Sequence, residues 1–273
     1  MTPLHTVLVT FAVVCAGCWL LSLITKEHSW VDRMWSIAPV IYVGEIASAA
    51  HFHNTRLNAI ALIVLLWGAR LTFNFARKGG YSGAEDYRWP VLRASMKPWQ
   101  FQLFNVFFIV LYQNFLLVLI SLPALNAFNH RATAFDVWDV ILVVIFILFL
   151  IGETLADQQQ WDFQQTKAGI IEHGGVPEKR FLTTGLFKFS RHPNYFFEQA
   201  QWWVLYLIGA NAAGLLLGRT IIGPVLLTIL FIGSTNFTEK LSLQKYPEYA
   251  DYQRSTSAVI PWTSKPGFRK NSA

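Results

Sequence analysis

Long runs of apolar residues, separated by short polar segments, dominate this sequence. Seven of the runs have lengths close to the ~20 residues that a transmembrane helix needs to cross a bilayer. Because the apolar residues are continuous rather than confined to one helical face, they predict helices surrounded by lipid. The predicted spans are residues 4–24, 34–50, 57–76, 101–122, 137–157, 194–217 and 219–237.

This pattern predicts an all-α fold, a polytopic membrane bundle of about seven transmembrane helices. The composition agrees, since only 14% of the residues are charged, against roughly 25% in a soluble domain. We expect residues 1–262 to form a single transmembrane domain and residues 263–273 to form a disordered tail. Cys15 and Cys18 lie within the first apolar run and are expected to be packing residues, with no disulfide and no metal site.

The basic residues predict an orientation in the membrane. Of the 22 Lys and Arg residues, 19 fall in one set of alternate loops, and only Arg56, Arg131 and Arg219 fall in the other. The positive-inside rule then places the N-terminus outside and the C-terminus in the cytosol. The basic excess is therefore a sign of membrane topology rather than of nucleic-acid binding.

A polar segment, TGLFKFSRHPNYFFE at residues 184–198, comes just before the sixth apolar run. Pro193 suits the first turn of a helix, and the free N–H groups of a helix N-terminus attract anions. The segment therefore predicts a phosphate or carboxylate site at the membrane surface, and a simple interfacial anchor is the alternative. Its polar residues are Ser190, Arg191, His192, Asn194, Tyr195 and Glu198.

The end of the fifth span carries a second polar pattern. Glu153, Asp157, Gln160 and Gln164 follow helical spacing and share one face. Because two acids at this spacing repel each other, the face predicts a cationic or hydrogen-bonding partner, unless the helix merely emerges into water. Near the second span, Asp32 and Arg33 either mark a site or pair with each other at the interface.

These segments resemble a known family. LFKFSRHPNYFFE and KYPEYADYQRSTSAVIPW, together with WGARL, GAEDYRW and ETLADQQ, are similar to the steroid 5α-reductase superfamily, and in particular to its bacterial branch, a domain of unknown function (DUF1295). The resemblance covers roughly residues 35–262. The RHPNY piece alone is less specific, because isoprenylcysteine carboxyl methyltransferases and phospholipid methyltransferases share it.

The resemblance implies a seven-helix membrane fold that binds NADPH from the cytosolic side, through a C-terminal half at about residues 150–262. Guanidinium groups bind phosphate oxygens bidentately, which suits Arg180 and Arg191. The resemblance also implies a bacterial inner-membrane location. The residues at the corresponding cofactor positions are Glu153, Asp157, Arg180, Asn194 and Glu198, with Arg191, His192 and Tyr195 beside them.

One position departs from the superfamily. The steroid reductases carry a proton-donating tyrosine three residues before an arginine of the third span, and here Trp67 precedes Arg70. Since an indole cannot protonate an enolate, either the catalytic acid lies elsewhere, with Asp32 and Tyr112 as the candidates, or the substrate is not an enone steroid.

Three functions are compatible with the sequence. The first is an NADPH-dependent reductase that acts on a CH–CH group of a lipophilic substrate entering from the bilayer. The alternative is an S-adenosylmethionine-dependent methyltransferase of a lipid or a lipidated thiol. The third is a transporter or scaffold, for which internal repeats are the expected sign, and the sequence shows none. The expected partners are the lipophilic substrate and membrane lipids, without nucleic acid.

Overall fold

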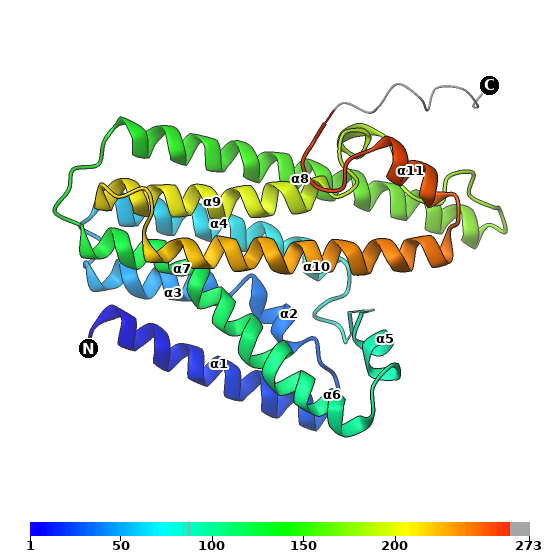
Figure 1. Cartoon of the computed structure of the whole chain (residues 1–273), viewed down its shortest axis with the longest axis horizontal. Coiled ribbons are helices and arrows are strands. Elements are labelled where there is room, and N and C mark those ends of the chain that lie inside the picture. The colour runs from blue at the N-terminus through cyan, green and yellow to red at the C-terminus, as the bar shows by residue number, and fades with distance from the viewer. Residues whose placement is uncertain (84, 87, 263–273) are drawn as a thin grey trace. The chain divides into compact units, whose positions relative to one another are not determined.

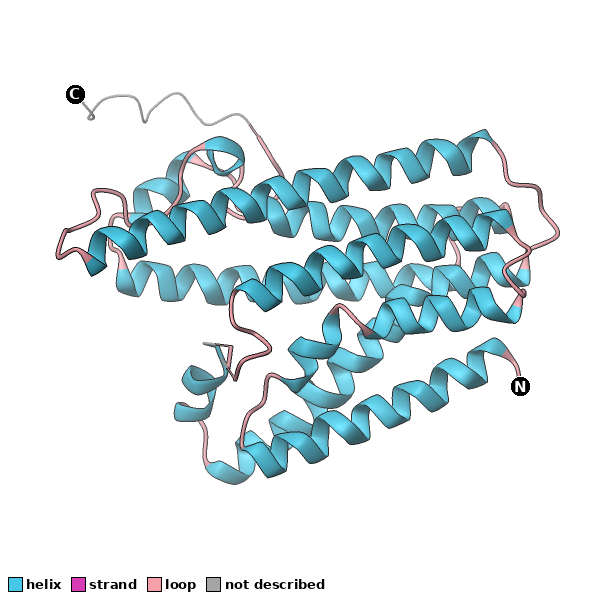
Figure 2. Cartoon of the chain, turned by 180° about the vertical axis from the view of Figure 1, so that it is seen from behind, coloured by secondary structure: helices cyan, strands magenta, loops and turns pink. Residues whose placement is uncertain are grey.

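A computed structural model of the chain describes residues 1–83, 85, 86 and 88–262. These residues form helices joined by loops, as Figure 2 shows, and a single isolated bridge, between Ser190 and Ser257, is their only β-type pairing. The predicted all-α fold is confirmed. The predicted tail, residues 263–273, lies outside the described residues.

Five helical segments of the described chain are long and apolar enough to cross a membrane, so the chain is a multi-pass helical membrane protein. Figure 1 labels the helices that form them. One segment combines three elements, α6 (Pro98–Phe104), the π-helix η1 (Asn105–Tyr112) and α7 (Gln113–Asn129). The five are α1 (Pro3–Thr25), α4 (Thr55–Arg77), Pro98–Asn129, α8 (Val137–Glu172) and Arg219–Lys245, which joins η3 (Arg219–Ile221) to α10 (Ile222–Lys245).

The predicted count of seven is not supported, for two different reasons. Helix α3 (Ala38–Ala49) has only 12 residues, or about 18 Å at 1.5 Å per residue, against the ~30 Å of a hydrocarbon core. Helix α9 (Pro193–Ala213) is long enough, with 21 residues, but it carries Glu198 and Gln201 on its buried surface.

The described chain divides into two compact units. The first consists of residues 1–146 and 202–227, and the second begins at residue 147, continues to 201 and resumes at 228. The chain passes from one unit to the other within α8, α9 and α10. The single domain that we predicted over residues 1–262 stays a prediction.

In the first unit, α3 packs against α1, α4 and α7. Gly68 of α4 permits this, because a Cβ there would lie 2.4 Å from Val40 of α3. Trp67, the residue that stands where the steroid reductases have a tyrosine, is completely buried and packs edge-to-face on Trp202, with 4.7 Å between ring centroids. Its place in the core explains an indole at this position.

A buried ion pair closes one end of the first unit. Arg56 donates from Nε and Nη2 to the two carboxylate oxygens of Asp139, at 2.8 and 2.7 Å, and from Nη1 to Thr133. Arg56 is 2% exposed and Asp139 is fully buried. Arg56 is thus a structural residue that joins α4 to α8. Although we counted it among the three basic residues of the outer loops, it adds no charge to the surface there.

In the second unit, α8 meets α9 closely at Gly152, where a Cβ would lie 2.6 Å from the ring of Phe197. Helix α8 has 36 residues and therefore extends well past the predicted end at residue 157. Its length of about 54 Å exceeds a bilayer core, so its C-terminal part projects from the membrane. After α10 the chain turns back into the short helix α11 (Tyr249–Ser255), as Figure 1 shows.

The orientation remains a prediction that reporter fusions test. With the seven crossings predicted from the sequence, a fusion after Arg131 and a fusion at the C-terminus report opposite sides of the membrane, as the uneven distribution of basic residues requires. With crossings by the five segments alone, only α8 and Arg219–Lys245 separate the two fusions, and both report the same side. Protease protection of the same fusions serves as the control. Reporters on the same side would contradict the predicted topology.

Candidate functional site

The RHPNY segment lies in the second unit, where α9 begins at Pro193 as predicted. Before it, the 3-10 helix η2 (Gly185–Lys188) rests on α8, since Leu186 N donates to Gln159 Oε1 at 2.9 Å. Gly185 has a φ of 62°, a conformation that favours glycine. This contact sets where the polar segment reaches the start of α9.

Residues 256–262, here called the C-terminal strap, run alongside residues 189–192. Arg191 N donates to Ser257 O at 2.9 Å, and His192 N donates to Ala258 O at 3.0 Å. Ser190 Oγ donates to Val259 O at 2.7 Å. The backbone N–H groups of Arg191 and His192, the two residues before Pro193, are therefore bonded to the strap. The anion site at the first turn of α9 stays a prediction.

The side chain of Arg191 also faces the protein. It donates from Nε and Nη2 to the two carboxylate oxygens of Glu239, at 2.7 and 2.9 Å, and from Nη1 to the carbonyl oxygens of Gln253 and Thr256. Arg191 and Glu239 are each only 9% exposed. The predicted contact of Arg191 with cofactor phosphate is thus not supported, because its guanidinium group clamps α10 and the strap.

His192 belongs to the same network. Its Nε2 lies 3.1 Å from Glu239 Oε1, and its ring stacks on Tyr195 with 5.1 Å between centroids. Tyr195 in turn meets Phe231 edge-to-face. His192 and Tyr195, two of the three residues that we placed beside the cofactor, thus connect the start of α9 to α10.

The tyrosines after α10 form an aromatic cluster around Phe181. Its ring contacts those of Tyr246, Tyr249 and Tyr252, with centroids 5.0–6.1 Å away. The hydroxyl of Tyr252 donates to Phe187 O. Burial raises the pKa of both Tyr249 and Tyr252, so these hydroxyls stay protonated and act as fixed donors.

The polar face predicted on α8 meets α9. Glu153 and Asp157 are both buried, and Gln201 Nε2 donates to Glu153 Oε2 at 2.7 Å. Glu198, also buried, lies three residues before Gln201 and so shares its face of α9. Gln201, which we did not predict, is thus a hydrogen-bonding partner of Glu153 on this face.

The side-chain amide of Gln201 has one polar atom, its oxygen, that is not hydrogen-bonded within the described chain. Its Oε1 is buried and has no hydrogen-bond partner among the residues that the structure describes. Since a buried acceptor without a donor is costly, it is a candidate ligand contact. Thr235 Oγ1 on α10 is in the same condition within the described part of the second unit.

Arg180 stands in a different setting, half exposed, with its Nε 3.7 Å from Glu248 Oε1. Lys167 Nζ donates to the backbone oxygen of Arg180 at 2.6 Å and to the Tyr246 hydroxyl at 3.1 Å. Lys167 and Lys245 both lie over the Tyr246 ring, at 5.0 and 5.4 Å. We call Lys167, Arg180, Lys245 and Tyr246 the Tyr246 cation cluster.

The cluster changes the chemistry of its tyrosine. Burial works to raise the pKa of Tyr246, but the hydrogen bonds and charges of Lys167 and Lys245 outweigh it and lower that pKa. Nothing in the sequence pointed to these lysines, because they lie 78 positions apart.

Asn194 is the last of the residues that we predicted to contact the cofactor. It is half-buried in the first turn of α9.

The two candidate acids belong to the first unit. Asp32 lies in α2 (Trp30–Trp35) and accepts a hydrogen bond from Trp89 Nε1 at 2.8 Å. Burial raises the pKa of Asp32, although Arg88 opposes the shift. The interface interpretation paired Arg33 with Asp32, but the acid that Arg33 pairs with is Glu27, and its Nε donates to Gly80 O.

Tyr112 is the last residue of the π-helix η1. Its ring stacks on that of Phe108, with 5.4 Å between centroids. The neighbouring Asn114 is completely buried and donates to Val110 O. Because π-helical turns often occur at functional sites, the geometry keeps Tyr112 as the second candidate acid.

Glu85 and Asp86, in the loop that precedes α5 (Arg88–Ala94), both bond neighbouring residues of the protein. Glu85 accepts from Arg93 Nη2 at 2.7 Å and from His28 N at 3.0 Å, and Asp86 pairs with Arg88. These bonds lower the pKa of Glu85 even though burial acts the other way. The acids therefore hold the loop in place.

Comparison with known proteins now assigns the chain. The family described as "Protein of unknown function (DUF1295)" matches residues 18–256, a range that includes every candidate residue above. The chain belongs to this family. No solved structure matches the chain.

The chain is also similar to a protein from a yeast. The chain is 40% identical over 260 residues to the "Uncharacterized protein C594.04c" of Schizosaccharomyces pombe, and the match covers 89% of this chain and 75% of the relative. Because the relative is from a yeast, the bacterial inner membrane stays a prediction for this member of the DUF1295 family.

Proposed function

We propose that the chain is an integral membrane reductase that uses NADPH to reduce a C=C bond of a lipophilic substrate. The observation that carries the proposal is the buried face between α8 and α9, where Gln201 bonds Glu153 and keeps a free acceptor. The resemblance of the RHPNY and KYPEY segments to the steroid 5α-reductase superfamily supports the same reading.

The second unit offers groups that fit the parts of NADPH. The Tyr246 cation cluster supplies the charges that phosphate groups need. Buried carboxylates such as Glu153 and Glu198 are suitable acceptors for ribose hydroxyls. Gln201 Oε1 is a suitable acceptor for the amide of a nicotinamide ring. In this proposal Arg191 holds the strap instead of touching the cofactor.

Reduction of a C=C bond needs a hydride and a proton. When bound, NADPH supplies the hydride. Asp32 is the better candidate for holding the proton, because burial raises its pKa and so favours the protonated carboxyl. Trp67 is excluded, since its indole lies in the core of the first unit.

One observation favours the methyltransferase as a second candidate. Glu239 occupies the guanidinium of Arg191, so that cation is not available to phosphates. The α8–α9 face is acidic, and acids suit the positive sulfonium of S-adenosylmethionine. The reductase remains our proposal because Lys167, Arg180 and Lys245 replace the lost charge.

Nucleotide binding to the purified full chain tests the proposal. We expect NADPH to raise the melting temperature, and NADH to raise it less because it lacks one phosphate. The double variant Lys167→Ala/Lys245→Ala should weaken NADPH binding by about one to two decades, since a charged hydrogen bond contributes ~1.5–3 kcal/mol.

Lys240→Ala is the matched control, because Lys240 is an exposed lysine of α10 outside the cluster. It should leave NADPH affinity unchanged. The same protein, reconstituted in membranes, should oxidise NADPH with lipophilic enones. Methyl transfer from S-adenosylmethionine to lipid acceptors, without NADPH oxidation, would instead establish the second candidate.

A further inference from the structure

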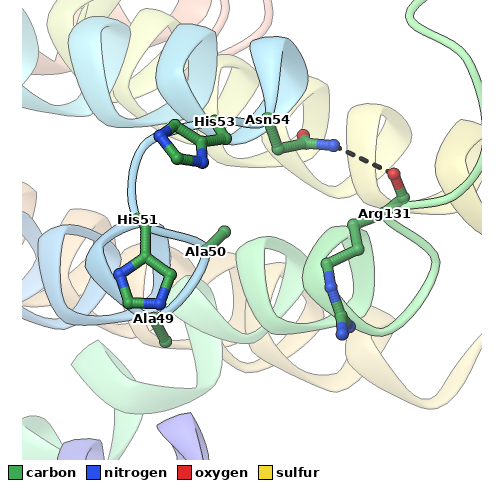
Figure 3. A pocket seen from close by; sticks show the side chains of 6 residues that line it. All are labelled: Ala49, Ala50, His51, His53, Asn54 and Arg131. Atoms are coloured by element: carbon green, nitrogen blue, oxygen red, sulfur yellow. Dashed lines mark hydrogen bonds between the residues drawn. The ribbon is translucent and has the colours of Figure 1, made fainter.

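A cavity of about 460 Å³ opens in the first unit at the turn between α3 and α4, apart from the residues proposed above. Its volume lies in the range of roughly 300–1,000 Å³ that small-molecule sites occupy. The walls come from this turn and from the loop that follows α7. They are formed by Ala49, Ala50, His51, His53, Asn54 and Arg131 (Figure 3).

The lining of this cavity is rich in donors and contains no carboxylate. Figure 3 shows His51 and His53 on one side of the opening and Arg131 on the other. The two imidazole rings are 6.3 Å apart. A guanidinium and two imidazoles around one space attract an anion, because their N–H groups all donate.

Contacts that occupy only one nitrogen of the Arg131 guanidinium, Nη1, hold the rim of the cavity in shape. Asn54 Nδ2 donates to the backbone oxygen of Arg131 at 3.0 Å and ties the two walls together, as the dashed line in Figure 3 shows. The guanidinium of Arg131 rests 4.5 Å over the Phe128 ring, and Nη1 bonds the Phe128 carbonyl. The bond from Asn54 to Arg131 thus links the two parts of the lining.

The turn itself is strained. His51 and Phe52 have φ values of 52° and 56°, a left-handed conformation that is costly for residues other than glycine. The turn keeps both histidines in the lining of the cavity and leaves Phe52 exposed between them. An exposed phenylalanine at the end of a membrane bundle suits contact with the lipid interface.

We propose that this cavity binds a phosphate group, carried by a lipid headgroup or by a small soluble molecule. Phosphate matches the lining because a guanidinium can bind two of its oxygens at once and the imidazoles add further donors. The proposal concerns the first unit alone and does not depend on the reductase reaction.

The test titrates the full chain, purified in a maltoside detergent, with short-chain phosphatidylglycerol, short-chain phosphatidylcholine and inorganic phosphate, using calorimetry. We expect phosphatidylglycerol or phosphate to bind, and phosphatidylcholine to bind more weakly because the cationic lining repels choline. Arg131→Gln should weaken binding at least about tenfold. Binding of inorganic phosphate by itself would assign a soluble ligand, and binding of phosphatidylglycerol without binding of inorganic phosphate would assign a headgroup. Binding of neither would overturn the proposal.

Arg219→Gln is the matched control, since Arg219 is an exposed arginine of the first unit that lies in η3, outside the lining of the cavity. It should change the affinity less than about twofold. The second test variant is His51→Asn with His53→Gln, because asparagine tolerates the left-handed backbone. Unchanged binding in Arg131→Gln, or an equal loss in Arg219→Gln, would overturn the proposal.

Discussion

Replacing Arg191 by alanine is expected to lower the free energy of unfolding by about 3–5 kcal/mol, the usual cost of breaking a buried ion pair. The variant leaves the Glu239 carboxylate buried without its guanidinium. It also removes the donor that holds the backbone of Gln253 and Thr256. The measurement is thermal unfolding of the purified protein in detergent.

The same variant should release the C-terminal strap. We expect protease to cut within residues 256–262 sooner than in the unmodified protein, because cleavage follows the population of the opened state. Arg254→Ala is the matched control, since Arg254 pairs with Asp251 on the surface and is 74% exposed, and surface pairs contribute little. An Arg191→Ala protein with normal stability but weaker NADPH binding would restore the phosphate contact predicted from sequence.

Asp139→Ala is expected to have an effect of similar size in the first unit, about 3–5 kcal/mol. It leaves Arg56 buried with its charge unbalanced, because both carboxylate oxygens that accept from Nε and Nη2 are removed. The carbonyl oxygens of Thr133 and Ala134 still accept from the guanidinium but carry no negative charge. A lower melting temperature of the detergent-purified protein is the expected result.

The double variant Arg56→Leu/Asp139→Leu provides the control. Replacing a buried pair by apolar residues is often neutral, so the double variant should be more stable than Asp139→Ala. The double-mutant cycle, completed with the two single leucine variants, measures the coupling between the residues. A double variant as unstable as Asp139→Ala would show that the site depends on packing instead of charge.

Parts of the fold followed directly from local sequence. The apolar runs predicted α1, α4, α8 and α10, because a run of this length is stable in lipid whatever it packs against. Pro193 predicted the start of α9, since proline suits the first turn in any fold. The acidic face of α8 predicted a partner, because Glu153 and Asp157 are neighbours on the helix.

The lengths of the short helix α3 and the long helix α8 could not be predicted from the local sequence. The apolar run at residues 34–50 looked like a span, but only Ala38–Ala49 forms the helix, and it packs among α1, α4 and α7. Helix α8 continues to Glu172 although its apolar run ends earlier. Apolar composition predicts that a segment avoids water. Whether it is covered by lipid or by protein depends on which helices pack against it in the folded chain.

The sequence by itself determined a multi-pass helical membrane protein of the DUF1295 family, and it pointed to the RHPNY segment and the α8 face as candidate sites. Only the tertiary structure decided which partners the charged residues have. Arg191 binds Glu239, 48 positions away, and Lys167 meets Tyr246, 79 positions away. The physical reason is that a guanidinium or an ammonium group bonds any acceptor within reach, and the folded chain decides which acceptor that is.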